Sequence, residues 1–258
     1  MGRASRSREG RGIEGDRRAI GRAACIAAPI LLTACRGPQS ALDPAGPAAS
    51  AIATGWWLMA TVALVAWALV LLLAGLAMRR RRRLGARGGQ RMIMVGGVLV
   101  PAILLAALLV YGTLASDRIT GARDQVEHVV RVTARQWQWE FEYLDASGTP
   151  VAVSIDQLAL PLDAMVEFHI GSADVIHSFW IPRLGGKIDA IPGRTNVWRL
   201  RAAQPGPMRG QCAEFCGLEH AHMEFGVTVL EAEGFARWLQ ANAISDTGAE
   251  AGSGGATR

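Results

Sequence analysis

Charged residues are scarce in this chain of 258 residues, where they make up 19% of the composition against 50% for hydrophobic residues. A disordered chain has the opposite balance, because it offers too little apolar surface to offset the entropy lost on ordering, so disorder over the whole length is excluded. Charges are missing altogether from residues 55–78 and 92–115. Apolar residues that cluster in this way also exclude an ordinary soluble domain. The length predicts one or two folded domains.

Acidic residues are almost absent from the first 116 residues, which hold four of the 22 in the chain. The same region holds 15 of the 27 basic residues. Beyond residue 116 the balance reverses, since 18 acidic residues face 12 basic ones and the net charge is −6. This argues against a nucleic-acid-binding domain and in favour of a surface that attracts a cationic partner.

The four cysteines do not form a Cys-x-x-Cys-His sequence, so no c-type haem is expected on this chain. Cys35 ends an arginine-rich leader and a short apolar stretch, 23–34. About a dozen residues are too few to span a bilayer of roughly 30 Å, but they suit the core of a signal peptide, which we expect over residues 1–34. The sequence LTAC looks like a bacterial lipobox, in which cleavage leaves Cys35 as a lipidated N-terminus. The alternative is an unmodified cysteine after an uncleaved leader.

Residues 35–54 are rich in proline, alanine, glycine and serine, and predict a periplasmic linker. The two charge-free stretches that follow are each 24 residues long. A helix of that length measures roughly 36 Å, which is enough to span a membrane. Residues 55–115 therefore predict a transmembrane hairpin. The loop 79–91 inside it carries seven arginines, which places the loop on the cytoplasmic side and both chain ends outside.

Beyond residue 116 the apolar residues alternate with polar ones, as in β-strands. The aromatic residues of 137–143 and the apolar residues of 130–134 have opposite phases, so we expect a β-bulge near Arg135 and Gln136. Many short strands separated by turns predict a β-sandwich or small barrel over residues 116–240. Further strands are expected at 151–155, 165–170, 195–200 and 225–230.

The end of the chain predicts a different structure. Residues 231–243 have the pattern of one amphipathic helix that buries Phe235, Trp238 and Leu239. The tail is rich in glycine, alanine and threonine, and we expect residues 241–258 to be disordered.

The residues best suited to chemistry lie in the stretch QCAEFCGLEHAHM, where Cys212, Cys216, His220 and Met223 recur every three or four residues. His177 precedes this stretch. Two thiolates, imidazoles and a thioether favour copper or zinc over hard cations. One cysteine, two histidines and a weak axial methionine would make a mononuclear blue-copper site. A second cysteine changes this prediction, because two thiolates can bridge two copper ions.

Other interpretations of the same residues stay open on spacing alone. A disulfide between Cys212 and Cys216 is compatible with an oxidising compartment, but it leaves the histidine and the methionine without a role. A structural zinc site with two cysteines and two histidines has suitable ligands but the wrong spacing. The spacing also does not decide between His220 and His222. Two further histidines, in strand-like stretches, are expected to be ordinary surface or core residues: His128 and His169.

Three stretches resemble subunit II of the haem–copper cytochrome c oxidases: ARQWQWEFEY, DVIHSFWIPRLGGKIDAIPGR and GQCAEFCGLEHAHM. The resemblance extends over residues 50–240. It implies a two-helix membrane hairpin that bears an external cupredoxin-like Greek-key β-barrel. It also implies a dinuclear copper centre, called CuA, which takes electrons from cytochrome c and passes them to haem in subunit I.

The resemblance assigns a role to each residue of the copper site. His177 and His220 would be the two imidazole ligands, which selects His220 from the two candidates. Cys212 and Cys216 would be the bridging thiolates. Met223 would be the weak thioether ligand.

The resemblance extends to residues around the copper. Glu214 would add its backbone carbonyl as a copper ligand, and its side chain would help to hold a magnesium ion at the contact with subunit I. Trp137 matches the tryptophan through which electrons enter, although an aromatic residue that only packs in the sheet is the alternative. Many family members have a glutamate seven residues before the proline of the second membrane helix, near the mouth of a proton channel. Here that position is Met94, so the channel role does not transfer.

The sequence therefore predicts a subunit of a proton-pumping terminal oxidase in a bacterial inner membrane, with its C-terminal domain in the periplasm. Its partners would be subunit I, where oxygen is reduced, other oxidase subunits, cytochrome c and the lipid bilayer, with no nucleic acid. Two alternatives stay open: the CuA-bearing subunit of a nitric oxide reductase, and a membrane-anchored mononuclear blue-copper carrier. A quinol-oxidase subunit II would share the fold, but that branch lacks the copper ligands present here.

Overall fold

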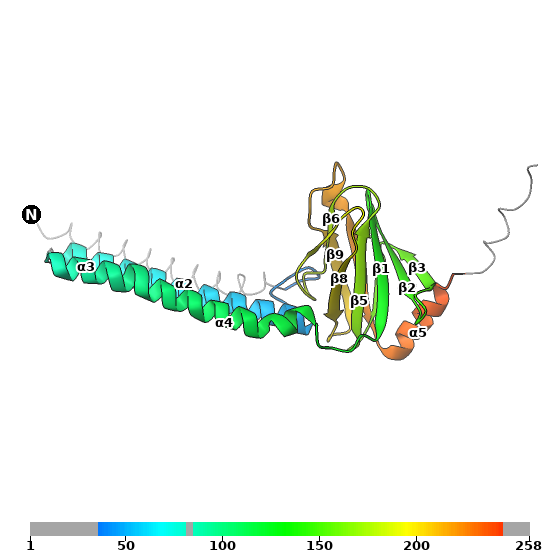
Figure 1. Cartoon of the computed structure of the whole chain (residues 1–258), viewed down its shortest axis with the longest axis horizontal. Helices are drawn as coiled ribbons and strands as arrows, with labels where there is room; N and C mark the ends of the chain where they lie inside the picture. The colour runs from blue at the N-terminus through cyan, green and yellow to red at the C-terminus, as the bar shows by residue number, and fades with distance from the viewer. Residues whose placement is uncertain (1–35, 81–84, 245–258) are drawn as a thin grey trace, which may run out of the picture.

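The computed structural model describes residues 36–80 and 85–244 of the chain. Figure 1 shows a long pair of helices that leads into a β domain, with a short helix packed on the side of that domain farthest from the pair. Two long apolar helices followed by a β domain are the fold class expected from the sequence. The expected signal peptide, 1–34, and Cys35 lie outside the described residues.

The first long helix, α2, runs from Pro47 to Arg80. Its partner consists of α3 (Ala86–Met94), a π-helical turn η1 (Val95–Leu99) and α4 (Val100–Thr120). Both contain stretches apolar enough to cross a membrane, with mean hydropathies of 2.5 and 2.8. Both also extend beyond the charge-free stretches, because alanine and arginine in the flanking segments are good helix formers. Hydropathy therefore locates the apolar part of each helix rather than its ends.

Tyr111 of α4 fastens the two long helices together. Its hydroxyl donates a hydrogen bond of 2.9 Å to the carbonyl of Ala51 in α2. Its ring lies so close to Gly55 that a Cβ there would stand 3.0 Å from Cε1. The π-helical turn ends two residues before Pro101, which has no N–H to continue the α-helical hydrogen bonds. Helix α4 ends at Gly121, whose φ of 61° is the left-handed conformation that stops a helix.

Within the described residues, ten strands form two five-stranded sheets. One sheet has the order β3-β2-β1-β5-β8 and the other the order β4-β10-β9-β6-β7. The strands of the first are β1 (His128–Arg135), β2 (Gln138–Leu144), β3 (Pro150–Ile155), β5 (Met165–Ser172) and β8 (Asn196–Arg201). The strands of the second are β4 (Gln157–Pro161), β6 (His177–Trp180), β7 (Ile188–Ala190), β9 (Gly206–Cys212) and β10 (Glu224–Leu230).

The core lies between the two sheets and is built largely from aromatic rings. Trp139 and Phe141 from β2 meet Phe179 from β6 and Phe225 from β10, with ring centroids 5.2 to 6.4 Å apart. All four are buried, and such rings contribute most of the apolar area that a core removes from water. The four strands expected beyond residue 150 are confirmed as β3, β5, β8 and β10.

The β-bulge expected near Arg135 and Gln136 is wrong. Strands β1 and β2 pair without a register shift as far as Arg135 opposite Gln138, so Gln136 and Trp137 form a two-residue turn. Residues paired across a hairpin point to the same face, which is why Ala134 and Trp139 are both buried. The change of phase comes from the reversal of the chain. Trp137 accordingly belongs to the turn and not to a strand.

The predicted linker, 35–54, is partly a docked segment and partly helix. We call residues 36–46 the strap, because hydrogen bonds hold it along the β domain. The backbone N–H of Arg209 donates to the carbonyl of Pro38 at 3.1 Å, and the N–H of Ala203 donates to the carbonyl of Ala45 at 2.7 Å. Residues 47–54 are the first turns of α2. The strap therefore joins the β domain to the start of the helix pair.

Helix α5 (Ala232–Ala241) confirms the amphipathic helix expected near the C-terminus. Phe235 is buried, and Trp238 packs on Tyr143 with ring centroids 5.0 Å apart. Residues 242–244 of the expected tail follow β3, since the N–H of Ile244 donates to the carbonyl of Val151 at 3.1 Å. Residues 245–258 lie outside the described residues.

Candidate metal centre

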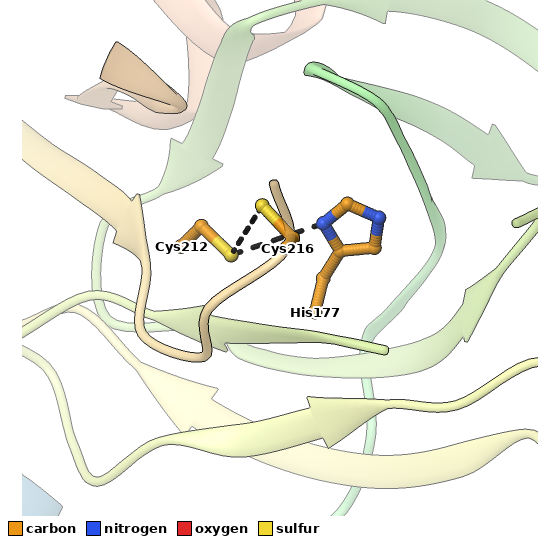
Figure 2. A group of neighbouring side chains, drawn as sticks. All are labelled: His177, Cys212 and Cys216. Atoms are coloured by element: carbon orange, nitrogen blue, oxygen red, sulfur yellow. Dashed lines mark hydrogen bonds between the residues drawn. The ribbon is translucent and has the colours of Figure 1, made fainter. Parts of the chain in front are cut away.

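His177, Cys212 and Cys216 lie side by side in the β domain (Figure 2). Their possible ligand atoms are all within 4.8 Å of one another, and all three residues are buried. The Nδ1 atom of His177 is 3.8 Å from the Sγ of Cys212, and the two sulfur atoms are also 3.8 Å apart. A disulfide would bring the sulfurs to ~2.05 Å. The two cysteines are therefore free thiols that face each other.

Adjacent strands of the second sheet position this group. His177 begins β6 and Cys212 ends β9, and Phe179 pairs with Cys212 in the ladder between them. The N–H of Cys212 donates to the carbonyl of Met223 at 2.9 Å, immediately before β10. The loop from β9 to β10 thus begins and ends at the site, and it carries Cys216 between those two points.

The same loop brings a second imidazole and the thioether to the second thiol. The Nδ1 atom of His220 is 3.6 Å from the Sγ of Cys216, and the Sδ of Met223 is 3.7 Å from it. The short 3-10 helix η2 (His220–His222) turns the next histidine outward. The His222 side chain is 79% exposed and lies 3.0 Å from a carboxylate oxygen of Glu219. In the structure it is His220, and not His222, that faces the thiols.

The remaining histidines, His128 and His169, lie in the first sheet and have neighbours away from the thiols. The ring of His128 packs on Phe235 with centroids 5.1 Å apart. Burial lowers the pKa of His128, although Glu127 acts in the opposite direction. The Nε2 atom of His169 lies 2.8 Å from a carboxylate oxygen of Glu167. His128 therefore has a packing contact with α5, and His169 has a hydrogen-bonding partner within β5.

The backbone and the side chain of Glu214 have different neighbours. Its carbonyl oxygen is 3.2 Å from the Sγ of Cys212, which donates to it as a thiol. Its carboxylate is half exposed and lies 3.9 Å from the Nζ of Lys187. The backbone carbonyl of Glu214 therefore lies beside the two thiols. Its side chain points away from them and could bind a group outside the site.

Trp137 lies in the β1–β2 turn with 37% of its surface exposed. Its ring lies against Gly217, where a Cβ would stand 3.1 Å from Cζ2 and 3.2 Å from Nε1. Gly217 has a φ of 129°, a conformation that side chains other than glycine rarely adopt. Because Gly217 directly follows Cys216, the exposed ring covers the peptide next to a buried thiol.

Sequence reasoning missed two residues of this site, Asp174 and Gln136. One carboxylate oxygen of Asp174 lies 2.8 Å from the Nε2 of His177, and the other accepts the backbone N–H of Gln136 at 2.7 Å. A carboxylate that holds one ring nitrogen leaves the other free to face a metal, as is common around metal-binding histidines. The carboxylate three residues before the candidate ligand, in the stretch DVIH, could have given this signal.

The charges around the thiols follow from burial and hydrogen bonding. Burial by itself raises the pKa of Asp174, but hydrogen bonds from His177 and from the backbone N–H of Gln136 outweigh it and hold the net pKa below its usual range. Burial, and next the neighbouring Cys212, raises the pKa of Cys216. Without a cation this thiol therefore keeps its proton, which must leave when a metal binds.

The donor set decides which metals fit. Two thiols, two imidazole nitrogens and a thioether are soft or borderline donors that suit copper or zinc better than magnesium or calcium. The His177, Cys212 and Cys216 group is consistent with a copper site. Its burial would keep water away from a bound ion.

Residues 147–230 match the protein family described as "Cytochrome C oxidase subunit II, periplasmic domain". The chain is 33% identical over 229 residues to "Cytochrome c oxidase subunit 2" of Alkalihalophilus pseudofirmus, an alignment that covers 82% of this chain and 65% of that protein. It is 31% identical over 157 residues to the protein of the same name from Branchiostoma floridae, covering 54% of this chain and 68% of that protein.

Among solved structures, the chain is similar to the periplasmic domain of subunit II of cytochrome oxidase of Bradyrhizobium japonicum. The identity is 31% and the TM-score 0.43, with 46% of this chain and 94% of that domain covered. The chain spans 65% and 68% of the length of these two curated relatives. The match to the domain family and the identity to full-length relatives together show that the chain belongs to the cytochrome c oxidase subunit II family.

Proposed function

We propose that this chain carries a dinuclear copper centre, CuA, that accepts electrons from cytochrome c and passes them to haem in subunit I of the oxidase. The observation that supports this proposal best is the pairing of two buried thiols with two imidazoles. His177 faces Cys212, and His220 faces Cys216. A single copper ion needs only one thiolate, so the doubled arrangement favours two ions over the mononuclear blue-copper alternative.

Five residues would hold the two ions, with the Glu214 carbonyl as a sixth ligand. When bound, the copper pair would supply a one-electron carrier whose charge is shared over two ions and two sulfurs. The chain's part is to keep the ligands in place in both oxidation states. Strands β6, β9 and β10 do this, because each holds or borders at least one ligand in a hydrogen-bonded sheet. The five ligands with side-chain donors are His177, Cys212, Cys216, His220 and Met223.

The side-chain carboxylate of Glu214, rather than its backbone carbonyl, would bind magnesium. The half-exposed carboxylate has Lys187 as a neighbour 3.9 Å away, a distance at which an exposed ion pair contributes little. Such a carboxylate can serve a cation shared with another chain, and subunit I would supply the other ligands. Carboxylate oxygen is the donor that magnesium prefers.

Trp137 would be the point at which electrons enter. Its exposed ring lies one peptide unit from Cys216, which offers a short path from a docked cytochrome. In the assembled oxidase we expect Trp137→Phe to slow electron transfer within the complex while the affinity for cytochrome c stays nearly unchanged. Rapid-mixing kinetics at two salt concentrations measure both quantities. Weakened binding with an intact internal rate would make Trp137 a docking residue only.

The membrane placement completes the proposal. The two helices would lie in a bacterial inner membrane with the β domain in the periplasm, after removal of residues 1–34 and lipidation of Cys35. Oxygen reduction and proton pumping would occur in subunit I and not in this chain. Mass spectrometry of the mature N-terminus tests the processing step, because a peptide that contains Arg17 to Arg22 on the purified subunit would exclude it.

Copper loading of the full chain in detergent tests the central proposal. We expect two coppers per chain and an electron resonance spectrum in which one unpaired electron is shared by two copper nuclei. Cys216→Ser should leave at most one ion, because a bridging thiolate is lost. A wild-type chain that binds one zinc and no copper, or that gives a blue single-copper spectrum, would overturn the proposal.

A further inference from the structure

Gln136 contacts both halves of the metal site from outside it. Its side-chain Nε2 donates a hydrogen bond of 2.8 Å to the carbonyl of Cys216. Its backbone N–H donates at 2.7 Å to Asp174, whose other carboxylate oxygen lies 2.8 Å from the Nε2 of His177. One residue is therefore connected to a thiol-bearing peptide directly and to an imidazole through a carboxylate.

These two connections join segments that are far apart in the sequence. Gln136 precedes Asp174 by 38 residues and Cys216 by 80 residues. The first sheet supplies the turn, whereas the second sheet supplies His177 at the start of β6 and the loop that carries Cys216. The hydrogen bonds of Gln136 thus link the two sheets at the metal site.

The fit of the turn against the loop is close. A Cβ on Gly217 would stand 3.0 Å from the Gln136 Nε2 and 3.1 Å from the Trp137 Cζ2. The peptide between Cys216 and Gly217 is consequently packed against the side chains of both turn residues, Gln136 and Trp137. The amide of Gln136 fixes the direction of the Cys216 carbonyl, and the ring of Trp137 covers it.

We propose that Gln136 is a positioning residue whose side-chain amide, in a turn anchored by the backbone bond to Asp174, holds Cys216 in the geometry that the metal requires. This inference rests on the proposed copper function. Gln136 offers no ligand atom of its own. Its effect comes from its two hydrogen bonds, which couple the exposed turn with Trp137 to one sulfur ligand and one imidazole ligand.

The matched variants are Gln136→Met and Arg131→Met, both made in the full chain in detergent. Methionine has nearly the length of glutamine but cannot donate to the Cys216 carbonyl, and it keeps the backbone N–H that bonds to Asp174. Arg131 lies on β1 and pairs at the surface with Glu142. Its replacement removes a polar group from the same hairpin without touching the site.

Three measurements report on position rather than on folding. In the copper-free chain we expect alkylation of Cys216, located by peptide mass spectrometry, to become about fivefold faster in Gln136→Met, the factor for losing one hydrogen bond from the closed loop. In the copper-loaded chain the hyperfine pattern and the reduction potential should both change. Arg131→Met should match the wild type in all three measurements.

The outcomes separate this inference from the proposed function. If the wild-type chain forms the two-copper centre and Gln136→Met shows wild-type alkylation, spectrum and potential, then Gln136 is not a positioning residue and only this inference fails. If the wild-type chain binds no copper pair, the proposed function fails, while the alkylation rates still show whether Gln136 holds the loop. Gln136→Asn, one methylene shorter, should behave like Gln136→Met, because its amide cannot reach the carbonyl.

Discussion

The ring of Trp137 packs on Gly217 so closely that a methyl group there would have to displace the ring by a few tenths of an ångström. A Cβ on Gly217 would be 3.1 Å from Cζ2 of the ring and 3.0 Å from the Nε2 of Gln136. The contact is possible because Gly217 adopts a φ of 129° without a side chain. An exposed aromatic residue and the peptide that follows Cys216 are thereby held in direct contact.

We predict that Gly217→Ala displaces Trp137 and slows electron transfer from cytochrome c in the assembled oxidase. The backbone strain and the contact together should also destabilise the domain by ~1–3 kcal/mol. Gly148→Ala is the matched control, since Gly148 has a φ of 82° and no atom within 4 Å of its Cβ position. That variant should lose stability through strain alone. Equal transfer rates in the two variants would show that the contact between Gly217 and Trp137 has no role in transfer.

Much of this fold could be predicted because its signals are local. Apolar stretches without charge mark the two membrane helices, and alternation marks the strands that pack one face on the core, such as β3 and β10. Four strands were not predicted. Strands β6 and β7, of four and three residues, are too short to show a period. Strand β4 is buried at four consecutive positions and β9 contains two glycines and a proline, so neither shows a clear alternation of apolar and polar residues. The candidate ligands could be named because cysteine, histidine and methionine occur together in one short stretch, and the choice of His220 over His222 came from the family resemblance.

The parts of the structure that the sequence did not predict depend on contacts between segments that are far apart in the chain. The strap has no apolar period, because it is held by backbone hydrogen bonds and by small buried residues such as Ala45. The spacing of Asp174 and His177 is a local signal, but nothing local points to Gln136, whose bond to Asp174 forms only when the fold brings the two residues together. The bulge expected near Gln136 was wrong for a related reason. Alternation shows that the phase changes, but a turn and a bulge change it equally well.

Met223 provides a test of the thioether at the metal site. Its Sδ lies 3.7 Å from the Sγ of Cys216, and the residue is buried. We predict that Met223→Leu keeps both coppers but raises the reduction potential by ~60 mV, which is a tenfold change for a one-electron couple. An apolar side chain gives no electron density to the more positive oxidised state. Redox titration of the copper-loaded chain measures the shift, and loss of a copper would instead make Met223 an essential ligand.

The contacts of Glu167, which lie outside the candidate metal centre, predict that the stability of the β domain depends on pH. Its carboxylate lies 2.8 Å from the Nε2 of His169 and 2.8 Å from the Nε of Arg199. The hydrogen bond from His169, followed by that from Arg199, lowers the pKa of Glu167 below its ordinary value of 4.5. A lowered pKa means that the folded state favours the charged form. The resulting stability is fully present above pH 4.5 and is lost as the pH falls through the lower, folded-state pKa.

We therefore predict that Glu167→Gln lowers the free energy of unfolding at pH 7 by about 1 kcal/mol, the usual size for a partly exposed charged hydrogen bond. The difference from the wild type should shrink towards pH 3. Urea unfolding followed by tryptophan fluorescence measures both values. Glu233→Gln is the control, because Glu233 and Arg237 form an exposed pair on α5 that should contribute little at any pH. A Glu167→Gln difference that is the same at both pH values would contradict the assignment.

Arg183 connects the strap to the β domain and offers the last test. Its Nε donates to the carbonyl of Asp43 at 2.8 Å, its guanidinium lies 3.3 Å from the Asp43 carboxylate, and it donates to Gln204 at 3.2 Å. The Arg183 side chain is only 14% exposed, so these bonds are poorly replaced by water. Its backbone carbonyl also accepts the N–H of Ala45 at 2.7 Å.

We predict that Arg183→Gln loosens the strap and leaves the metal site intact. Hydrogen exchange of the N–H groups of Ala45 and Ala203 should become about tenfold faster, which corresponds to the loss of ~1.4 kcal/mol from local opening. Exchange in β2 and the copper spectrum should stay at wild-type values. Because the strap joins the β domain to α2, electron transfer to subunit I should slow while reduction by cytochrome c does not. Unchanged exchange at Ala45 would show that the side chain of Arg183 does not hold the strap, which would then depend on its backbone hydrogen bonds and on those made by Gln39 and Gln204.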